Sequence, residues 1–455
     1  MTARVDTLKG EHDGGVAWRS LLLSLLVMLA LVATLHWGCL ALISKEKLDP
    51  YGLSDFYPLS VFRWRLPQPY QLATALGFAA WVGWSWSRLT RPGARLAVTL
   101  LVGLSFAVLS NLLHGVRFGL DYPTATSGDG GIEYYHDAIA IRGPLWLLER
   151  YNAVQFELLE HTRTHPPGPV LLYWLLHRAL GEPALISVAI AAIALGLLMP
   201  YLRRLLRLTL GEEPPGALLL FALLPALLVY GLAVVDAPIA GLFLATVVHF
   251  VDDRRRLHWL WAGCWLFSSL FFTFAALFLL PVLAGFELVR RKRLTHFVLT
   301  LLVAALLLVG VKLLFGFDWL QGFFTASAME NDKGFLLLAA PHFYLWYRLG
   351  GVAEIALFFT PFLWLLWRRG WALLREQSPD AAALAWLGPA SLAAMLLAGA
   401  LKIGEAARAC LFILPYLFLP VAAAYQRLPA PDRARTAYAV AAFGAAMQLL
   451  GFFQW

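Results

Sequence analysis

Apolar segments of about 20 residues alternate with short polar connectors along almost the whole chain. Such a segment is long enough to cross a hydrocarbon layer of about 30 Å. Lipid offers no partner to exposed backbone groups, so each crossing segment must be helical. The pattern predicts an all-α polytopic membrane protein, a single integral membrane domain over 1–455. About 13 transmembrane helices are expected, over 20–43, 71–89, 95–114, 183–202, 216–233, 236–251, 257–272, 274–289, 296–314, 350–367, 382–400, 407–425 and 436–454.

Arginine gathers in every second connector. The basic connectors follow the second, fourth, sixth, eighth, tenth and twelfth expected spans, and they contain Arg88, Arg91, Arg95, Arg203, Arg204, Arg207, Arg254, Arg255, Arg256, Arg290, Arg291, Arg293, Arg368, Arg369, Arg427, Arg433 and Arg435. Basic connectors face the cytoplasm, which places the amino terminus there too. The connectors 44–70, 115–182, 235–238, 315–349 and 401–408 then converge on the external face.

The apolar segment 170–180 is short and follows two prolines. If this segment were counted as a span, all later connectors would lie on the opposite side of the membrane, and their arginines would face outside. We therefore expect a juxtamembrane or re-entrant helix within the long external loop 115–182.

Composition agrees with a membrane protein. Hydrophobic residues make up 60% of the chain and charged residues 14%, and the mean hydropathy is +0.69. A soluble domain carries about a quarter charged residues. The net charge of +8 lies in the short connectors, which argues against nucleic acid as a partner. Cys39, Cys264 and Cys410 lie in or beside apolar segments and are interpreted as small core residues, without a metal or disulfide role.

The external loop holds the densest group of carboxylates, with Asp129, Glu133 and Asp137 among glycines and aromatics. Glu133 and Asp137 stand four residues apart, so a helix would place them on one face. Close carboxylates raise one pKa, which suits a general base or a cation site. The alternative is that these groups are solvated or pair with Arg142 and Arg150.

The same loop ends in His-Thr-Arg-Thr-His-Pro-Pro-Gly-Pro at 161–169. Proline ends the extended chain and starts the next helix, and the amino end of that helix together with Arg163 would form an anion site. The alternative is a rigid turn. A divalent cation could be held by His136 with Asp137 or Glu133, but the spacing is not diagnostic, so the cofactor stays open.

Asp236 lies between two apolar spans, after Tyr230 and before Pro238. An acid at a membrane boundary is a functional candidate by default, although an Asp-Ala-Pro sequence is also a good helix start.

Late in the chain, Lys402 and Arg408 lie on the expected external side, against the charge trend. Arg408 is just inside an apolar helix and needs an anionic partner, either Glu405 or a ligand phosphate. The second external loop adds His342, Tyr344, Trp346, Tyr347 and Arg348, a set that fits a binding surface or an interfacial aromatic belt.

The acidic external loop ending in His-Pro-Pro, the Asp-Ala-Pro turn and the late Gly-Glu with Arg408 together resemble the GT-C superfamily of polyprenyl-phosphate-dependent glycosyltransferases. The protein O-mannosyltransferase and aminoarabinose transferase branches are the most similar in kind. The resemblance implies a bacterial inner-membrane enzyme with its site on the periplasmic face. It would transfer a sugar from a polyprenyl-phosphate donor to a lipid, glycan or protein acceptor, with inversion.

The resemblance also suggests roles for residues of this chain. Asp137 is the first candidate for the general base, with Asp129 and then Glu133 as alternatives. The donor phosphate and sugar would contact Arg163, His165, Arg408, Lys402, Asp236, Tyr230 and His342.

Two other classes stay open. A lipid or solute transporter or flippase would show inverted repeats and broken helices with charges near mid-bilayer. An O-antigen ligase-like transferase would place its key Arg and His residues in a large late loop, for which 315–349 could serve. No Walker or Rossmann fingerprint is visible in the sequence, which argues against a nucleotide-sugar donor.

Overall fold

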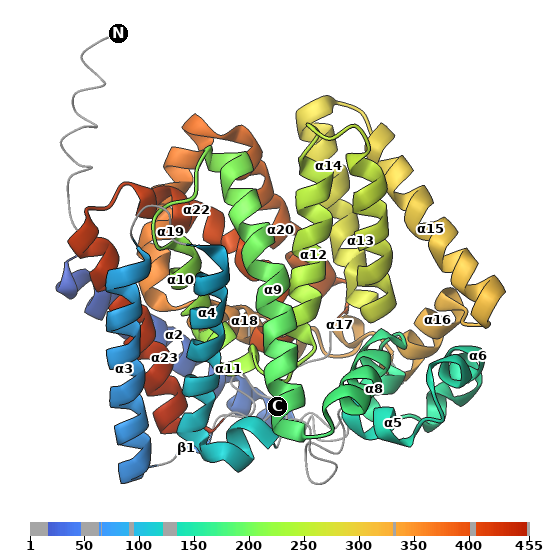
Figure 1. Ribbon diagram of the computed structural model, residues 1–455, viewed down its shortest axis with the longest axis horizontal. Helices are drawn as coiled ribbons and strands as arrows, with labels where there is room; N and C mark the ends of the chain where they lie inside the picture. The colour runs from blue at the N-terminus through green and yellow to red at the C-terminus, as the bar shows by residue number, and fades with distance from the viewer. Residues whose placement is uncertain are drawn as a thin grey trace.

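The computed structural model describes residues 17–46, 63–64, 66–90, 95–121, 134–330, 334–400 and 406–452. Within these residues the chain forms a bundle of helices (Figure 1), with one antiparallel pair of two-residue strands, β1 (Arg63–Trp64) and β2 (Gly451–Phe452). The all-α class is therefore confirmed.

Within the described residues, five helical segments are long and apolar enough to cross a membrane, which supports a polytopic membrane protein. They are α2 (Trp18–Glu46), α4 (Leu96–Asn111) with η2 (Leu112–His114), α9 (Pro183–Leu210), α15 (Thr295–Phe315) and α20 (Pro379–Leu397). A sixth is gained if α18 (Pro341–Phe358) and α19 (Pro361–Gln377) count together. The expected number of about 13 spans is not confirmed.

The other helices are shorter or less apolar. They are α3 (Pro69–Leu89), η3 (Arg117–Asp121), α5 (Tyr134–Ala140), α6 (Pro144–Val154), η6 (Gln155–Glu157), α7 (Glu160–Arg163), α8 (Gly168–Leu180), α10 (Ala217–Ala222), α11 (Pro225–Tyr230), α12 (Asp236–Val251), α13 (His258–Phe272), η7 (Phe274–Phe278), α14 (Leu279–Arg291), α16 (Trp319–Glu330), α17 (Leu336–Ala339), α21 (Ala406–Ala409), η8 (Leu411–Ile413), α22 (Leu414–Gln426) and α23 (Ala430–Leu450).

Three of the expected spans are interrupted within the described residues. The segment 407–425 contains α21, η8 and α22 in turn. The segment 216–233 is divided into α10 and α11 just before Pro225. The segment 350–367 is divided between α18 and α19, which meet at 91° just before Pro361. Proline lacks the N–H that would continue the helical ladder and clashes with the preceding turn. Thr360, at the break between α18 and α19, has a positive φ of 79°, so the chain leaves the helical conformation there.

The basic connectors meet at one end of the bundle. Arg204 pairs with Asp252, which joins the end of α9 to the connector between α12 and α13. Arg290, at the end of α14, lies 3.4 Å from Asp253 and 3.3 Å from Asp380, at the start of α20. These connectors lie at the top of Figure 1, whereas α5, α6 and α8 lie at the bottom. The alternation read from the sequence therefore corresponds to two distinct ends.

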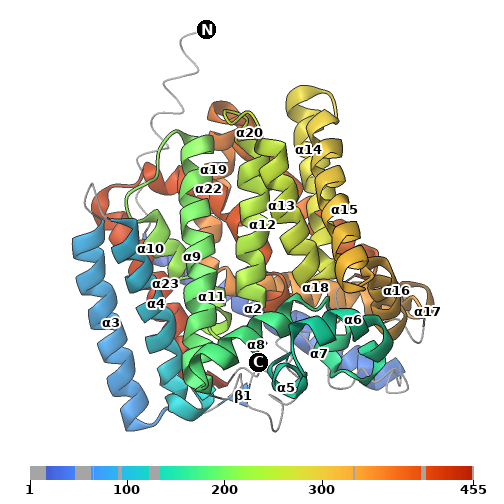
Figure 2. The same ribbon diagram turned by 45° about the vertical axis from the view of Figure 1, so that its right-hand side comes forward.

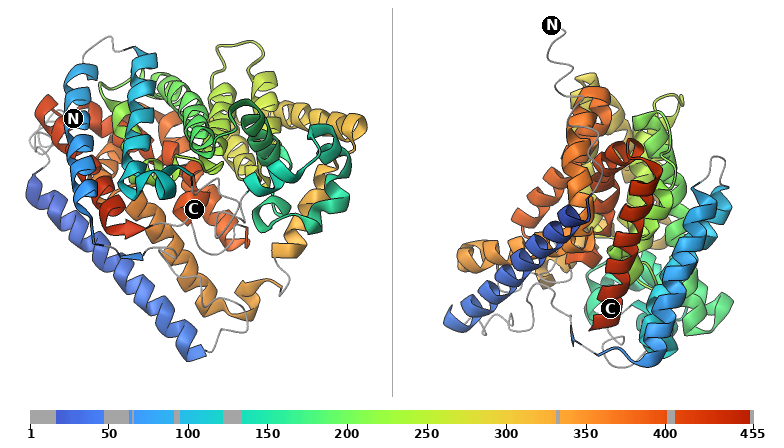
Figure 3. Two further views of the ribbon diagram at one scale, coloured as in Figure 1. Left: turned by 60° about the horizontal axis from the view of Figure 1, so that its bottom comes forward. Right: turned by 90° about the vertical axis from the view of Figure 1, so that its left-hand side faces the viewer.

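The core is built around α12, in which every residue after Asp236 is buried. It lies between α9 and α13 (Figure 2). Gly241 allows the close approach of α9, since a Cβ there would lie 2.5 Å from the Cβ of Leu197. By contrast, α2 runs along the outside of the bundle against α18 and α19 (Figure 3), and only 11% of its residues over Trp18–Leu35 are buried.

The short helix expected over 170–180 is present as α8. Its 13 residues pack against α5, α9 and α13. A helix of this length, about 20 Å, is too short to cross the hydrocarbon layer.

Candidate functional site

The segment that ends in His-Pro-Pro is held in place by aromatic side chains. The ring of Tyr134 in α5 meets His165 edge-on at 5.4 Å and stacks on Tyr173 of α8 at 6.2 Å. His165 Nδ1 lies 3.0 Å from the carbonyl oxygen of His161. The hydroxyl of Tyr151 in α6 donates to the carbonyl oxygens of Thr162 and His165. This part of the loop is thus a packed structure.

Asp137 lies beside this segment and is 9% exposed. Its Oδ2 accepts a hydrogen bond of 3.0 Å from the backbone N–H of Leu159, at the start of α7. Burial and the Asp137 carboxylate raise the pKa of the Tyr151 hydroxyl above its usual value. Asp137 therefore orders the loop in addition to any chemical role. Asp129 and Glu133 lie outside the described residues.

Arg163 closes α7, and its Nε is buried with no hydrogen-bond partner among the residues described. The next helix is tightly packed at its start, because a Cβ on Gly168 would lie 2.4 Å from the carbonyl oxygen of Phe271 in α13. The start of α8 is therefore packed closely against the end of α13. An anion site formed by this helix start together with Arg163 stays a prediction.

Asp236 and Arg408, far apart in the chain, form an ion pair. Asp236 is the first residue of α12 and Arg408 lies in α21, with Oδ2 and Nε 3.9 Å apart. Their side chains are 21% and 8% exposed. The sequence predicts Glu405 or a ligand as the partner of Arg408. Glu405 and Lys402 lie outside the described residues, so that prediction stays open, and Asp236 is a partner of Arg408 among the residues described.

Two further charged side chains are buried on α18, the helix that packs against α21 and so against the element that carries Arg408. Glu354 is 3% exposed, and its Oε1 accepts a hydrogen bond of 3.3 Å from the backbone N–H of Ala407. Arg348 is 8% exposed and lies 4.9 Å from the centre of the Tyr344 ring. We call Asp236, Arg348, Glu354 and Arg408 the buried charge cluster.

Glu354 was not among the candidates read from the sequence. It lies inside the apolar segment 350–367, and an acid within such a segment is itself a signal for function. Arg348 was read only as a member of the aromatic set.

Tyr230 and His342 differ in their surroundings. Tyr230 is buried at the end of α11 and its ring stacks on Phe358 of α18 at 5.2 Å, which brings it to the helix that carries Glu354. His342 is exposed in the first turn of α18.

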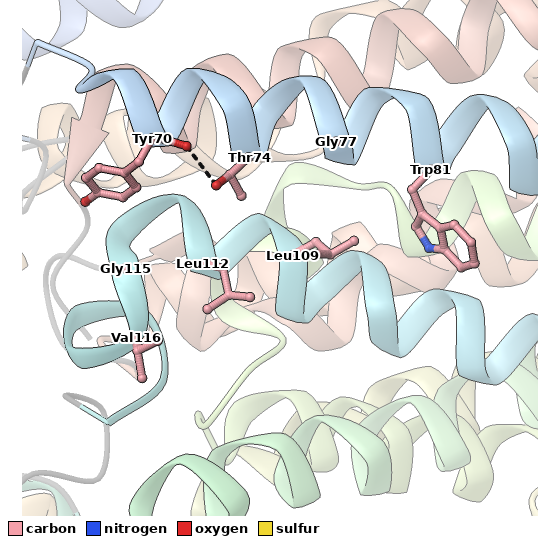
Figure 4. Close-up of a pocket in the computed structure, with 8 residues that line it drawn as sticks. All are labelled: Tyr70, Thr74, Gly77, Trp81, Leu109, Leu112, Gly115 and Val116. Carbon is pink, nitrogen blue, oxygen red and sulfur yellow. Dashed lines mark hydrogen bonds between the residues drawn. The ribbon is translucent and has the colours of Figure 1, made fainter.

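A groove of about 580 Å³ runs between α3 and α4 (Figure 4). Its lining is apolar except for Tyr70 and Thr74 at one end, and Trp81 lies at the other. No residue of the buried charge cluster lines it.

Comparisons with known proteins assign no family to the chain. No protein-family model and no curated protein matches the chain. Among the described residues, no three His, Cys, Asp or Glu side chains gather in a way that could hold a metal ion.

Proposed function

We propose that this chain is a membrane glycosyltransferase of the bacterial inner membrane. It transfers a sugar from a polyprenyl-phosphate donor to a hydroxyl of a lipid, glycan or protein acceptor at the periplasmic face, with inversion. The observation that carries the proposal is the buried charge cluster. Asp236 begins α12, whose other end leads into the arginine-rich connector at 252–257, so the cluster belongs to the half of the bundle away from the basic end.

The chemistry needs positive charge where a phosphate leaves. The acceptor oxygen attacks the anomeric carbon, the bond from that carbon to the phosphate oxygen breaks, and polyprenyl phosphate departs with the bonding electrons. The acceptor proton passes to a carboxylate base. Arg408 and Arg348, buried in a water-poor site, are suited to stabilise the phosphate because guanidinium binds phosphate through paired N–H groups.

The second half of the proposed site is the His-Pro-Pro segment. Arg163 supplies a cation with a buried, unpartnered Nε among the described residues, and His165 is held beside it in the same segment. Asp137 remains our first candidate for the base, with Asp129 and Glu133 as alternatives on the same loop.

The test is binding of polyprenyl phosphate to the full chain in nanodiscs. Wild type is compared with Arg408→Gln and Arg163→Gln, and with Arg375→Gln as a matched control, since Arg375 is exposed in the last turn of α19. We expect saturable binding that weakens at least tenfold in the first two variants and not in the control. Absence of saturable binding to wild type, or equal losses in all three variants, would overturn the proposal.

A transporter or flippase is the second candidate. It is favoured by discontinuous helices such as α10–α11 and α18–α19, because discontinuous helices often surround transport sites. Movement of a labelled lipid across proteoliposomes by wild type, with no binding of polyprenyl phosphate, would support this function over the transferase.

A further inference from the structure

The turn between α11 and α12 contains a strained residue. Ala233 has a positive φ of 68°, a conformation that crowds the Cβ of any L-residue and that glycine adopts freely. It is 1% exposed and stands three residues before Asp236. Strain of this kind persists only where the surroundings impose it.

Both backbone groups of Ala233 are held by other helices. The buried hydroxyl of Tyr173 in α8 donates to the Ala233 carbonyl oxygen. The Ala233 N–H donates to the carbonyl oxygen of Ser187 in α9 at 3.3 Å, and the Ser187 hydroxyl donates to the carbonyl oxygen of Leu120 at 2.7 Å. The turn is thus fixed from two sides.

Tyr173 also reaches the other half of the proposed site. Its ring stacks on Tyr134, and Tyr134 contacts His165 edge-on. A single side chain therefore touches both the support of the His-Pro-Pro segment and the turn that leads into Asp236.

We propose that Tyr173 is a positioning residue that imposes the left-handed conformation on Ala233 and so directs Asp236 toward Arg408. The contact of its ring with Tyr134 fixes the position of this ion pair relative to Arg163 and His165. The effect on ligand binding rests on the proposed function, whereas the effect on the turn does not.

The experiment uses Tyr173→Phe, Ala233→Gly and the double variant of the full chain in nanodiscs. The control is Tyr425→Phe, which removes a buried hydroxyl without a hydrogen-bond partner among the described residues. Two quantities are measured: hydrogen–deuterium exchange of peptides covering 231–240, and affinity for polyprenyl phosphate.

We expect Tyr173→Phe to speed exchange in this segment about fivefold, the effect of losing one hydrogen bond, and to weaken the affinity by a similar factor. Glycine at position 233 needs no imposed strain, so the double variant should recover most of the affinity although the hydroxyl is still missing. A merely structural tyrosine would give no such rescue. Tyr425→Phe should change neither quantity.

Unchanged exchange at 231–236 in Tyr173→Phe would overturn the positioning role. So would faster exchange whose loss of affinity is not recovered by Ala233→Gly. If wild type binds no polyprenyl phosphate, the proposed function fails, and the exchange measurement alone still decides whether Tyr173 imposes the turn.

Discussion

Replacing Asp236 and Arg408 by neutral residues, singly and together, tests whether this ion pair of the buried charge cluster serves stability or binding of the donor. At 3.9 Å, two unit charges attract by about 4 kcal/mol at an effective dielectric constant of about 20. Desolvation of both groups cancels much of this gain. Removing one partner leaves the other charge buried, which costs about 3–5 kcal/mol in protein interiors.

The two single variants should differ in cost. Asp236→Asn leaves Arg408, 8% exposed, without this partner, whereas Arg408→Gln leaves Asp236, 21% exposed. We expect a loss of about 3 kcal/mol in the free energy of unfolding for the first and about 2 kcal/mol for the second. The double variant should lose no more than the larger single loss, a coupling of about 2 kcal/mol.

Stability is measured by unfolding in mixed micelles with increasing SDS, followed by circular dichroism. Binding of polyprenyl phosphate is measured on the same four proteins. If the pair serves the donor, the double variant is no less stable than the weaker single variant but does not bind polyprenyl phosphate. Additive losses of stability would refute the reasoning about the pair, and binding by the double variant would reduce Arg408 to a structural residue.

Three further predictions follow from the loops and from close packing. Asp137→Asn keeps an oxygen for the amide at the start of α7, so it should abolish transfer with little loss of stability, whereas Asp137→Ala should lose both; full transfer by Asp137→Asn in a glycosyl-transfer assay would exclude Asp137 as the base. Gly168→Ala should destabilise the chain by about 1–3 kcal/mol through overpacking. Gly196→Ala is the matched control, because a Cβ at that position meets nothing within 4 Å, and it should be neutral or stabilise the chain by about 0.5–1 kcal/mol. Equal SDS-unfolding curves for the two variants would contradict the close approach of α8. The Lys312 ammonium holds the pKa of the Asp318 carboxyl below its usual 3.8, and Asp318 also caps α16, so Asp318→Ala should cost about 1 kcal/mol at pH 7. Because the folded-state pKa of Asp318 is lowered, the contribution of its charge to stability is complete above pH 3.8 and disappears as the pH falls through the folded-state pKa. If Asp318→Ala were still less stable than wild type by the full amount at the lowest pH, the carboxylate charge would not be the source of the difference.

The apolar pattern was enough to locate most helices but not their continuity. The segments 183–202, 296–314 and 382–400 appear as single helices, α9, α15 and α20. Pro200 and Pro389 are tolerated inside α9 and α20, whereas Pro225 and Pro361 stand at breaks. Proline alone therefore does not determine the break; Thr360 at a positive φ reflects the packing of α18 and α19, which no local pattern encodes.

The same limit applies to the site. Asp236 and Arg408 were each recognised as costly charges in apolar surroundings, and that argument is local. Their pairing is a tertiary contact between the start of α12 and α21, so the sequence could name only Glu405, the nearest acid in the chain, as a protein partner. Glu354 is the single acid of a mostly apolar segment, and its partner, the backbone N–H of Ala407, comes from a different helix, so no local pattern indicates what it contacts.

The geometry of the pair bears on how a phosphate could enter. A tight charge-assisted hydrogen bond between guanidinium and carboxylate is about 2.7–2.9 Å long and often bidentate, whereas Asp236 and Arg408 meet at 3.9 Å through Nε. The contact between these two groups is therefore longer than the strongest form of such a pair. In the proposed function, this is the contact that a phosphate oxygen would replace. Asp236 is also the more exposed of the two side chains, so its carboxylate can regain hydration when a phosphate takes its position beside Arg408.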